Sequence, residues 1–228
     1  MARDTDYIAS DVHLGAVPKS TERAFLRFLE HAGANARSVL LVGDLFDFWF
    51  EWGGVVPGKY FRVLSALAEV VDAGVPVTLI GGNHDAWGGA FLRDEVGVSF
   101  HPDTLVTELG GRRTLVAHGD GLGRGDHKYR VLKAVIRSRP AILGFRLLHP
   151  EIGMRIAGAA STTEGKAQRD EGARSRARYI EEWAVERIQA DPSLEMVVCG
   201  HSHAPVIREV ASGRHYVNSG DWIRNLSY

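Results

Sequence analysis

Side chains that bind divalent metal ions recur in five short clusters along this sequence. In chain order the clusters are Asp11-Val12-His13, Gly43-Asp44, Gly82-Asn83-His84-Asp85, His118-Gly119-Asp120 and Gly200-His201-Ser202-His203. They offer carboxylates, imidazoles and a carboxamide but no thiolate, which suits Mn²⁺, Fe²⁺ or Zn²⁺ at a catalytic centre. The donors are too many for one tetrahedral ion. The pattern therefore favours two ions, about 3.5–4 Å apart, that share a carboxylate and act on a phosphoryl group.

The spacing within the clusters supports this interpretation. In Asp11-Val12-His13 and His201-Ser202-His203 the paired donors are two residues apart, so an extended backbone points both to the same side. A single Asp-x-His or His-x-His motif is more often an ordinary surface or turn feature. Five clusters in order along one chain argue against coincidence.

Each cluster follows a short apolar run that is typical of a buried strand. With a sixth run before Asn218-Ser219-Gly220-Asp221, the runs are residues 7–9, 39–42, 75–80, 114–117, 196–199 and 215–217. Between the first three, residues 20–34 and 58–73 have the apolar spacing of amphipathic helices. The order predicts a layered α/β fold whose donors converge beyond the carboxyl ends of the strands.

Composition limits the class of protein. The 228 residues are 45% hydrophobic and 24% charged, which predicts one folded domain spanning residues 1–228 and excludes disorder and a multi-span membrane protein. The 27 Lys and Arg nearly balance the 28 Asp and Glu, so we expect no nucleic-acid partner. Cys199 is the only cysteine, and the first residues lack the pattern of a secretory signal. We expect a cytoplasmic protein.

Residues 121–190 interrupt the alternation of strands and helices. They contain no convincing strand and indicate helices broken at Pro140 and Pro150. Residues 121–160 carry eight Lys or Arg against two acidic residues, together with many large apolar side chains. This segment is predicted to be an inserted helical lid, although an ordinary amphipathic helix pair would give a similar pattern.

The five clusters resemble, in order, the signature blocks of the calcineurin-like metallophosphoesterases and cover almost the whole chain. The resemblance implies an α/β sandwich of two β-sheets flanked by helices, with a dinuclear centre in which Mn²⁺ is the favoured ion. It implies that one metal is bound by Asp11, His13, Asp44 and His203. The second metal would be bound by Asp44, Asn83, His118 and His201, so that Asp44 bridges the pair.

The same resemblance gives His84 a catalytic role without a metal. It would protonate the leaving oxygen or stabilise the developing charge, with Asp85 orienting its imidazole. Asp47 would support a metal-binding histidine or the backbone from behind. The alternative for His84 is a buried histidine with only a structural hydrogen bond.

The segment from Asp120 to Arg130 is similar to the one that follows the fourth block in UDP-2,3-diacylglucosamine pyrophosphatases of lipid A biosynthesis. Those enzymes release UMP and a lipid monophosphate, and they hold acyl chains under a lid at the position of this insertion. The similarity implies a lipid-linked nucleotide diphosphate as substrate. The substrate-binding residues it implies are Asp120, Asp126, Tyr129, Arg130, Ser161, Lys166 and Arg169.

Two alternatives stay open at this point. Several members of the pyrophosphatase family have arginine where this chain has His84, which leaves room for a broader phosphodiesterase or nucleotide pyrophosphatase of the same fold. A chain with a vestigial metal centre would instead be a membrane-surface or partner-binding module. The basic, apolar lid could also rest on the anionic inner leaflet of the cytoplasmic membrane. The oligomeric state is not indicated.

Overall fold

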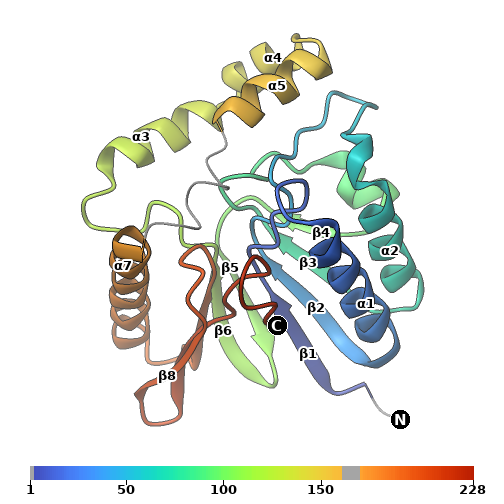
Figure 1. The fold of residues 1–228 in the computed structure, drawn as a ribbon. Helices are drawn as coiled ribbons and strands as arrows, with labels where there is room; N and C mark the ends of the chain where they lie inside the picture. Colours follow the sequence, from blue (N-terminus) through green and yellow to red (C-terminus); the bar gives the residue numbers. More distant parts are fainter. Residues whose placement is uncertain (1–2, 161–169) are drawn as a thin grey trace.

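The computed structural model describes residues 3–160 and 170–228, which form two β-sheets packed face to face with helices on their outer sides (Figure 1). The first sheet has the order β1-β2-β3-β4, and all of its pairs are parallel. Its strands are β1 (Thr5–Ala9), β2 (Ala36–Val42), β3 (Val77–Ile80) and β4 (Ser99–His101).

Two helices cover the outer face of the first sheet: α1 (Lys19–Asn35) and α2 (Phe61–Asp72), which a short 3₁₀ turn, η1 (Gly58–Tyr60), precedes. Their apolar faces supply Phe25, Leu29 and Leu67 to one buried cluster with strand residues such as Leu41. A short π-helical turn, η2 (Phe91–Glu95), leads into β4. Burial of these side chains is the main stabilisation of this half of the domain.

The second sheet has the order β5-β6-β7-β9-β8 and is mixed. Its strands, in chain order, are β5 (Leu105–Leu109), β6 (Arg112–Ala117), β7 (Met196–Cys199), β8 (Val206–Ala211) and β9 (Arg214–Asn218). The three inner strands β6, β7 and β9 run parallel, whereas β5 and β8 are antiparallel to their neighbours. Val42 and Ile80 of the first sheet pack with Val116 and Val198 of the second, which confirms the predicted sandwich.

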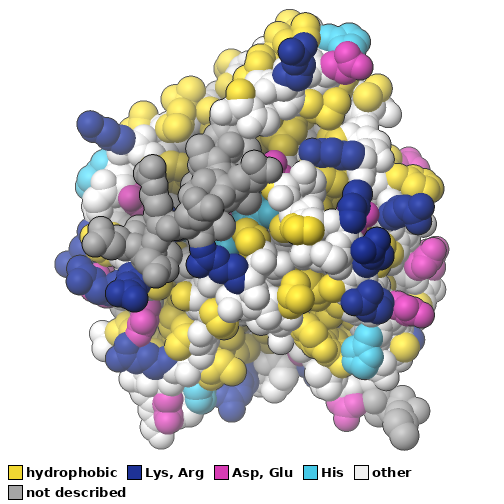
Figure 2. Space-filling model, in the orientation of Figure 1, with side chains coloured by type: hydrophobic (Ala, Val, Ile, Leu, Met, Phe, Trp, Pro, Cys, Tyr) yellow, Lys and Arg dark blue, Asp and Glu magenta, His cyan; other side chains and the backbone are white. Residues whose placement is uncertain are grey.

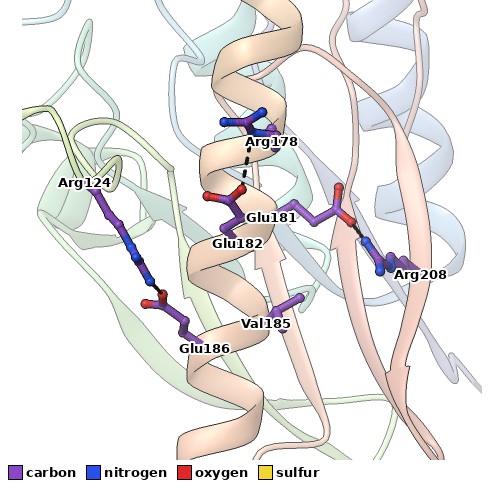
Figure 3. Close-up of a pocket in the computed structure, with 7 residues that line it drawn as sticks. All are labelled: Arg124, Arg178, Glu181, Glu182, Val185, Glu186 and Arg208. Atoms are coloured by element: carbon purple, nitrogen blue, oxygen red, sulfur yellow. Dashed lines mark hydrogen bonds and ion pairs between the residues drawn. The ribbon is translucent and has the colours of Figure 1, made fainter.

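Helix α7 (Asp170–Ala190) covers the outer face of the second sheet. Ile180, Ala184 and Ile188 are buried in a cluster with residues of β6, β7 and β9. Two ion pairs on its exposed side connect α7 to other elements (Figure 3). Arg208–Glu181 joins it to β8, and Arg124–Glu186 joins it to the loop that follows β6. Although α7 falls within the expected insertion of residues 121–190, it packs as an outer layer of the sandwich.

Three further helices lie across the carboxyl ends of the strands: α3 (His127–Ile136), α4 (Arg139–Arg146) and α5 (Pro150–Ala160) (Figure 1). We refer to these three helices as the lid. Pro140 lies in the first turn of α4 and Pro150 begins α5, where proline is compatible with helix geometry. Phe145 and Ala157 of the lid pack on an aromatic cluster of Phe48, Phe50 and Trp52.

Many large apolar side chains of the lid are exposed, among them Leu143, Leu147, Ile152 and Ile156. Figure 2 shows apolar side chains gathered along this end of the molecule, next to Lys and Arg. Among the described residues, no helix has both the length and the apolar character required to cross a membrane.

Candidate metal centre

The predicted donors meet at one end of the sandwich because the loops that carry them follow parallel strands. Backbone hydrogen bonds join these loops: Asp11 N donates to Gly43 O at 3.1 Å, and His13 N donates to Asp44 O at 2.9 Å. Gly200, after β7, also approaches, since a Cβ at that position would lie 2.7 Å from Asp11 Oδ2. The loops therefore bring the first, second and fifth clusters together.

Most of the predicted ligands have a left-handed backbone. Asp11, His13, Asp44, His201 and His203 have φ between 50° and 64°, and Leu226 is the other non-glycine residue with positive φ in the described chain. This conformation costs a non-glycine residue about 1–2 kcal/mol, so its concentration here indicates a functional constraint. The strained turns direct neighbouring polar side chains to the same place.

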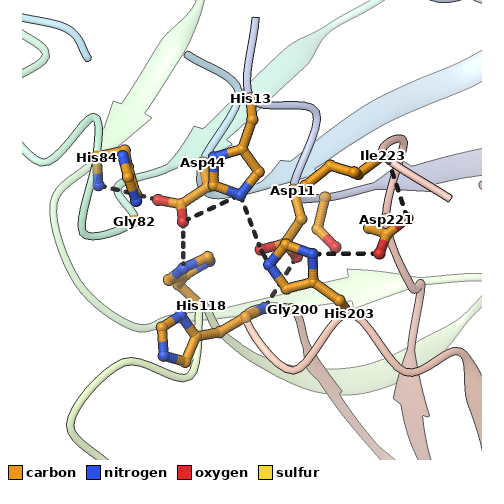
Figure 4. Close-up of polar contacts among 12 residues, drawn as sticks. Asp11, His13, Asp44, Gly82, His84, His118, Gly200, His203, Asp221 and Ile223 are labelled. Carbon is orange, nitrogen blue, oxygen red and sulfur yellow. Dashed lines mark hydrogen bonds and ion pairs between the residues drawn. The ribbon is translucent and has the colours of Figure 1, made fainter. Parts of the chain in front are cut away.

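One group of donors consists of Asp11, His13 and His203 (Figure 4). His203 Nε2 lies 3.5 Å from Asp11 Oδ1, and His13 Nε2 lies 4.0 Å from the same oxygen. Asp11 is fully buried, and its other oxygen accepts a hydrogen bond from His201 N at 2.8 Å. These residues are those that the resemblance assigns to the first metal, apart from Asp44.

A second group consists of Asp44, His118 and His201. His118 Nε2 lies 3.3 Å from Asp44 Oδ2, while His13 Nε2 of the first group lies 3.7 Å from the same oxygen. Asp44 thus lies between the two groups, in the place expected of a bridging carboxylate. A Cβ on Gly82 would lie 2.1 Å from Asp44 Oδ1, so only glycine fits there.

The donor atoms fit a pair of divalent cations. Asp11 Oδ1, Asn83 Oδ1 and both ring nitrogens of His13 are buried without a hydrogen-bond partner among the described residues. An unsatisfied buried polar atom costs about 1–3 kcal/mol, which metal coordination would offset. The donor set is rich in imidazole and carboxylate. The free thiol of Cys199 is not part of the set, because this side chain is buried in the apolar cluster beneath α7.

Electrostatics in the centre favour cations. Burial opposes the ionised form of Asp44, but His118 holds the pKa of that carboxyl well below its usual range. Burial likewise opposes a charged His118, yet the Asp44 carboxylate raises the pKa of this imidazole to about 10. Burial lowers the pKa of His13 to about 3, so its ring is neutral at pH 7 and the tautomer determines which ring nitrogen offers a lone pair to a metal.

Hydrogen bonds behind the ligands determine their orientation. His118 Nδ1 donates to Val42 O at 2.8 Å, which leaves Nε2 directed at Asp44. His203 Nδ1 lies 3.2 Å from Asp221 Oδ2, an arrangement that orients a metal-binding histidine and strengthens it as a ligand. From the sequence, the Asn218-Ser219-Gly220-Asp221 turn resembles the final turn of the family and is expected to be structural rather than catalytic. The sequence feature that could have indicated a role for Asp221 at the metal centre is its place in a sixth polar cluster that follows a strand.

His84 lies beside the centre with its ring held by Asp47. His84 Nδ1 donates to Asp47 O at 2.7 Å and lies 3.7 Å from Asp47 Oδ1. The His84 and His13 ring centroids are 4.9 Å apart. With Nδ1 engaged, Nε2 is the nitrogen available to a bound substrate.

Asp85 has a different position from the one expected. Its oxygens accept hydrogen bonds from the backbone N–H groups of Gly82, Asp44, Leu45 and Phe46, at 2.7–3.3 Å. It therefore stabilises two metal-binding loops, and in the described chain Asp47 holds the His84 ring in its place. The expectation that Asp85 orients His84 is corrected accordingly: four backbone donors surround a fully buried carboxylate.

An apolar pocket of about 450 Å³ opens beside His84 and Asn83. The core of the domain contributes Phe48, Phe50 and Trp87 to its wall. The lid contributes Leu132 and Ile136 of α3, Ala141, Ile142 and Phe145 of α4, and Ile156 and Ala157 of α5. A ligand held by the metal centre can thus extend an apolar portion beneath the lid.

The residues expected to bind substrate lie in three settings. Asp120 is buried and engaged by the lid: Tyr129 Oη and Lys133 Nζ each lie 2.9 Å from its Oδ2. Asp126 Oδ2 accepts from Gly123 N at 3.1 Å, and Arg130 donates to Gly123 O at 2.9 Å. Ser161, Lys166 and Arg169 lie outside the described residues. The four described residues are thus placed at the base of α3.

A third group, His13, Asp44 and His84, links the other two through His13 and Asp44. Overlapping groups of carboxylates and imidazoles at the strand ends of a two-sheet sandwich characterise a metal-dependent phosphoesterase. Residues 7–205 match the calcineurin-like phosphoesterase family, and the chain belongs to that family. It is a hydrolase that depends on divalent metal ions.

Curated relatives match nearly the full chain. The UDP-2,3-diacylglucosamine hydrolase of Porphyromonas gingivalis is 30% identical over 244 residues, which cover 99% of this chain and 93% of the relative. The enzyme of the same name from Pseudomonas fluorescens is 30% identical, and the match covers 94% of this chain and 86% of the relative. The enzyme of that name from Xanthomonas axonopodis is 28% identical, and the match covers 96% of this chain and 91% of the relative.

Proposed function

We propose that this protein hydrolyses UDP-2,3-diacylglucosamine to UMP and 2,3-diacylglucosamine 1-phosphate. The observation that carries the proposal is an apolar pocket beneath the lid, lined by Asn83 and His84, beside side-chain groups that could hold metal ions. A substrate with a diphosphate and acyl chains needs both features side by side. The relatives that span this chain bear the name of that activity.

In this reaction water attacks the α-phosphorus, and the bond to the bridging oxygen breaks, so that the lipid 1-phosphate leaves. When bound, two divalent cations activate the water and neutralise the phosphoryl oxygens. Asp11, His13, Asp44 and His203 would hold one ion, and Asp44, Asn83, His118 and His201 would hold the other. Left-handed backbone conformations at Asp11, His13, Asp44, His201 and His203 hold five of these donors in position before the substrate arrives.

His84 acts on the leaving group of the reaction. Asp47 O fixes Nδ1, so Nε2 of a protonated ring can transfer a proton to the departing oxygen or stabilise its charge. The ring is 9% exposed and lines the apolar pocket, so it adjoins the part of the substrate that leaves with the lipid.

The lid holds the acyl chains against aromatic and aliphatic side chains. The Phe145 ring centroid lies 6.1 Å from that of Phe48 and 4.8 Å from that of Phe50, and the three rings form a continuous apolar wall. Burial of acyl methylenes there is worth about 0.8 kcal/mol each. Asp120, Asp126, Tyr129, Arg130, Ser161, Lys166 and Arg169 would contact the polar portion of the substrate.

We further propose Mn²⁺ as the ion and a cytoplasmic protein that contacts the inner leaflet peripherally. The donor set of oxygen and imidazole nitrogen without thiolate supports Mn²⁺. The exposed Leu143, Leu147 and Ile152, near the cationic Arg139 and Arg146, support contact with an anionic membrane surface.

The test is UMP release from UDP-2,3-diacylglucosamine by purified protein with Mn²⁺, compared with hydrolysis of bis(4-nitrophenyl) phosphate. We expect a strong preference for the lipid nucleotide, and loss of that preference when residues 135–160 are deleted. Turnover of the simple diester without UMP release would reject the proposal.

The histidine at position 84 favours a second candidate, a broader phosphodiesterase or nucleotide pyrophosphatase. A histidine can protonate many leaving groups, whereas an arginine at this position only stabilises charge. This candidate predicts that UDP-glucose and bis(4-nitrophenyl) phosphate are turned over as fast as the diacylated substrate.

A further inference from the structure

The loop that carries Asn83 and His84 is held from two sides. From the core, Asp85 Oδ1 accepts a hydrogen bond from Gly82 N at 2.8 Å. From the lid, Arg137 Nη2 donates to Gly82 O at 3.0 Å. Both polar groups of Gly82 are therefore engaged immediately before Asn83, whose Oδ1 is a buried donor atom for a metal.

Arg137 is fixed in this position. It follows the last residue of α3, its side chain is 14% exposed, and its Nη1 donates to Pro102 O at 2.7 Å and Asp103 Oδ1 at 3.0 Å. A second bond joins the same elements, because Trp87 Nε1 donates to Ile136 O at 3.1 Å. The end of α3 is thus anchored to both ends of the Gly82–Trp87 loop.

The same helix forms part of the apolar pocket. Leu132 and Ile136 line the pocket together with Asn83 and His84. None of the residues of α3 is fully buried, and polar contacts at Asp120 and Gly82 attach it to the metal-binding loops. A ligand that packs against Leu132 and Ile136 therefore also restrains the helix end that holds Gly82.

We propose that Arg137 is a positioning residue that holds the Gly82–Asn83 peptide for metal binding and couples it to occupancy of the apolar pocket. A ligand in the pocket restricts the motion of α3. Through the hydrogen bond from Arg137 to Gly82 O, it also restricts the motion of the Gly82–Asn83 peptide. The metal that Asn83 binds then has a higher affinity when an apolar chain is present. The inference rests on the proposed function only in taking an acyl chain as the natural occupant.

Titration of the metal-free protein with Mn²⁺, followed by the electron paramagnetic resonance signal of the free ion, tests this proposal without any substrate. The apolar probe is dodecyl maltoside below its critical micelle concentration, which has no metal-binding group. In the wild type we expect two sites, of which the weaker one tightens by about fivefold or more with the detergent. Arg137→Ala should weaken that site by about 10-fold or more and abolish its response to detergent.

Two further variants separate positioning from folding and from charge. Arg137→Lys keeps the charge and one donor, and it should restore part of the Mn²⁺ affinity. Arg155→Ala removes an exposed arginine of α5 and should match the wild type. Trp87→Phe keeps the aromatic wall but loses the bond to Ile136, so it should reduce the response to detergent.

Identical Mn²⁺ isotherms for Arg137→Ala and the wild type would overturn the positioning role. An unchanged response to detergent in Arg137→Ala would overturn the coupling. If the wild type shows the expected isotherms but releases no UMP, the proposed substrate is wrong and the role of Arg137 stands.

Discussion

At the scale of single residues, three imidazole rings at the metal centre are held at Nδ1, which leaves Nε2 as the nitrogen that can act. His118 and His203 are each fixed at Nδ1 and direct Nε2 at a carboxylate of the cluster. His84 is fixed at Nδ1 by Asp47 O, and its backbone N donates to Asp44 Oδ1 at 3.0 Å. His84 is not among the residues that the resemblance assigns to a metal, and its ring lies beside His13 and Asp44, with donor atoms within 4.8 Å of one another.

Substitution of Asp44 and of His84 should have different consequences. Asp44→Ala removes the carboxylate between the two donor groups, so we expect loss of bound Mn²⁺ and of activity. His84→Ala should keep nearly all bound metal and slow turnover by about 10²–10⁴-fold, which is typical of an acid–base residue. Metal analysis and single-turnover rates on the same preparations measure both. Equal metal loss in the two variants would contradict this separation of roles.

Asp221 should influence metal affinity through His203. Its Oδ2 lies 3.2 Å from His203 Nδ1, while Oδ1 accepts from the backbone N–H groups of Ile223, Arg224 and Asn225. Asp221→Asn should lower Mn²⁺ affinity by about 10–100-fold. Mn²⁺ titration calorimetry measures this change. Asp191→Asn, which alters a surface turn that includes Ser193, is the control and should leave affinity unchanged.

At the scale of elements, the strands and helices that could be predicted from the sequence are those whose side chains are buried. The six strands and two helices expected from the sequence lie within three residues of their observed bounds, because their side chains are buried and produce continuous apolar runs. Strands β4, β5 and β8 were missed. Each lies at the edge of a sheet and is incompletely buried, and β5 and β8 carry charged residues within the run, such as Glu108 and Arg208.

The metal donors were recognisable for a related physical reason: each directly follows a buried strand. Asp221 follows one too, yet its link to His203 spans 18 residues and depends on the final turn. The resemblance assigns Asp85 to the orientation of His84, whereas the observed contacts of Asp85 depend on how residues 43–46 fold around it. Tertiary contacts of this kind leave no periodic pattern.

The packing of α5 makes a prediction about the lid. A Cβ added at Gly153 would lie 2.5 Å from Trp52 Cζ2 and 3.2 Å from the Phe145 ring. Gly153→Ala must therefore displace the aromatic wall of the pocket. We expect a several-fold higher KM for UDP-2,3-diacylglucosamine with little change in hydrolysis of bis(4-nitrophenyl) phosphate, measured by steady-state kinetics.

Gly158→Ala is the matched control for this change. Gly158 lies on the same helix, and a Cβ at this position would have no neighbouring atom within 4 Å. Alanine favours a helix over glycine by about 1 kcal/mol, so this variant should retain the wild-type KM and unfold no more readily. If both variants raise KM equally, helix propensity rather than the aromatic contact explains the effect.

At the scale of the whole molecule, the two sheets are joined at both ends by different chemistry. Metal-binding loops meet at the carboxyl ends of the strands. Near the start of β1, Asp6 accepts hydrogen bonds from Ser38 Oγ of β2 at 2.6 Å and from Gly110 N, in the β5–β6 turn of the second sheet, at 2.7 Å. Arg37 also pairs with Asp6. One carboxylate therefore connects the sheets at the end opposite the metal centre.

This contact should make stability depend on pH in a defined direction. Burial by itself raises the pKa of Asp6, but hydrogen bonds from Arg37, Ser38 and Gly110 bring it below the ordinary value of 3.8. A depressed pKa in the folded state adds stability above that ordinary value, and the contribution disappears as the pH falls through the folded pKa. Asp6→Asn should therefore lower the free energy of unfolding by about 1 kcal/mol at pH 7.

Urea unfolding between pH 7 and pH 3 measures the difference between Asp6→Asn and the wild type. The difference should stay constant down to about pH 4 and shrink below it, since the wild-type carboxylate then becomes protonated. Bound Mn²⁺ should be equal in both, because the contact lies far from the metal loops. Asp94→Asn, which removes an exposed partner of Arg93, should leave the unfolding curve unchanged. A difference independent of pH would show that the shape of the side chain, rather than its charge, joins the sheets.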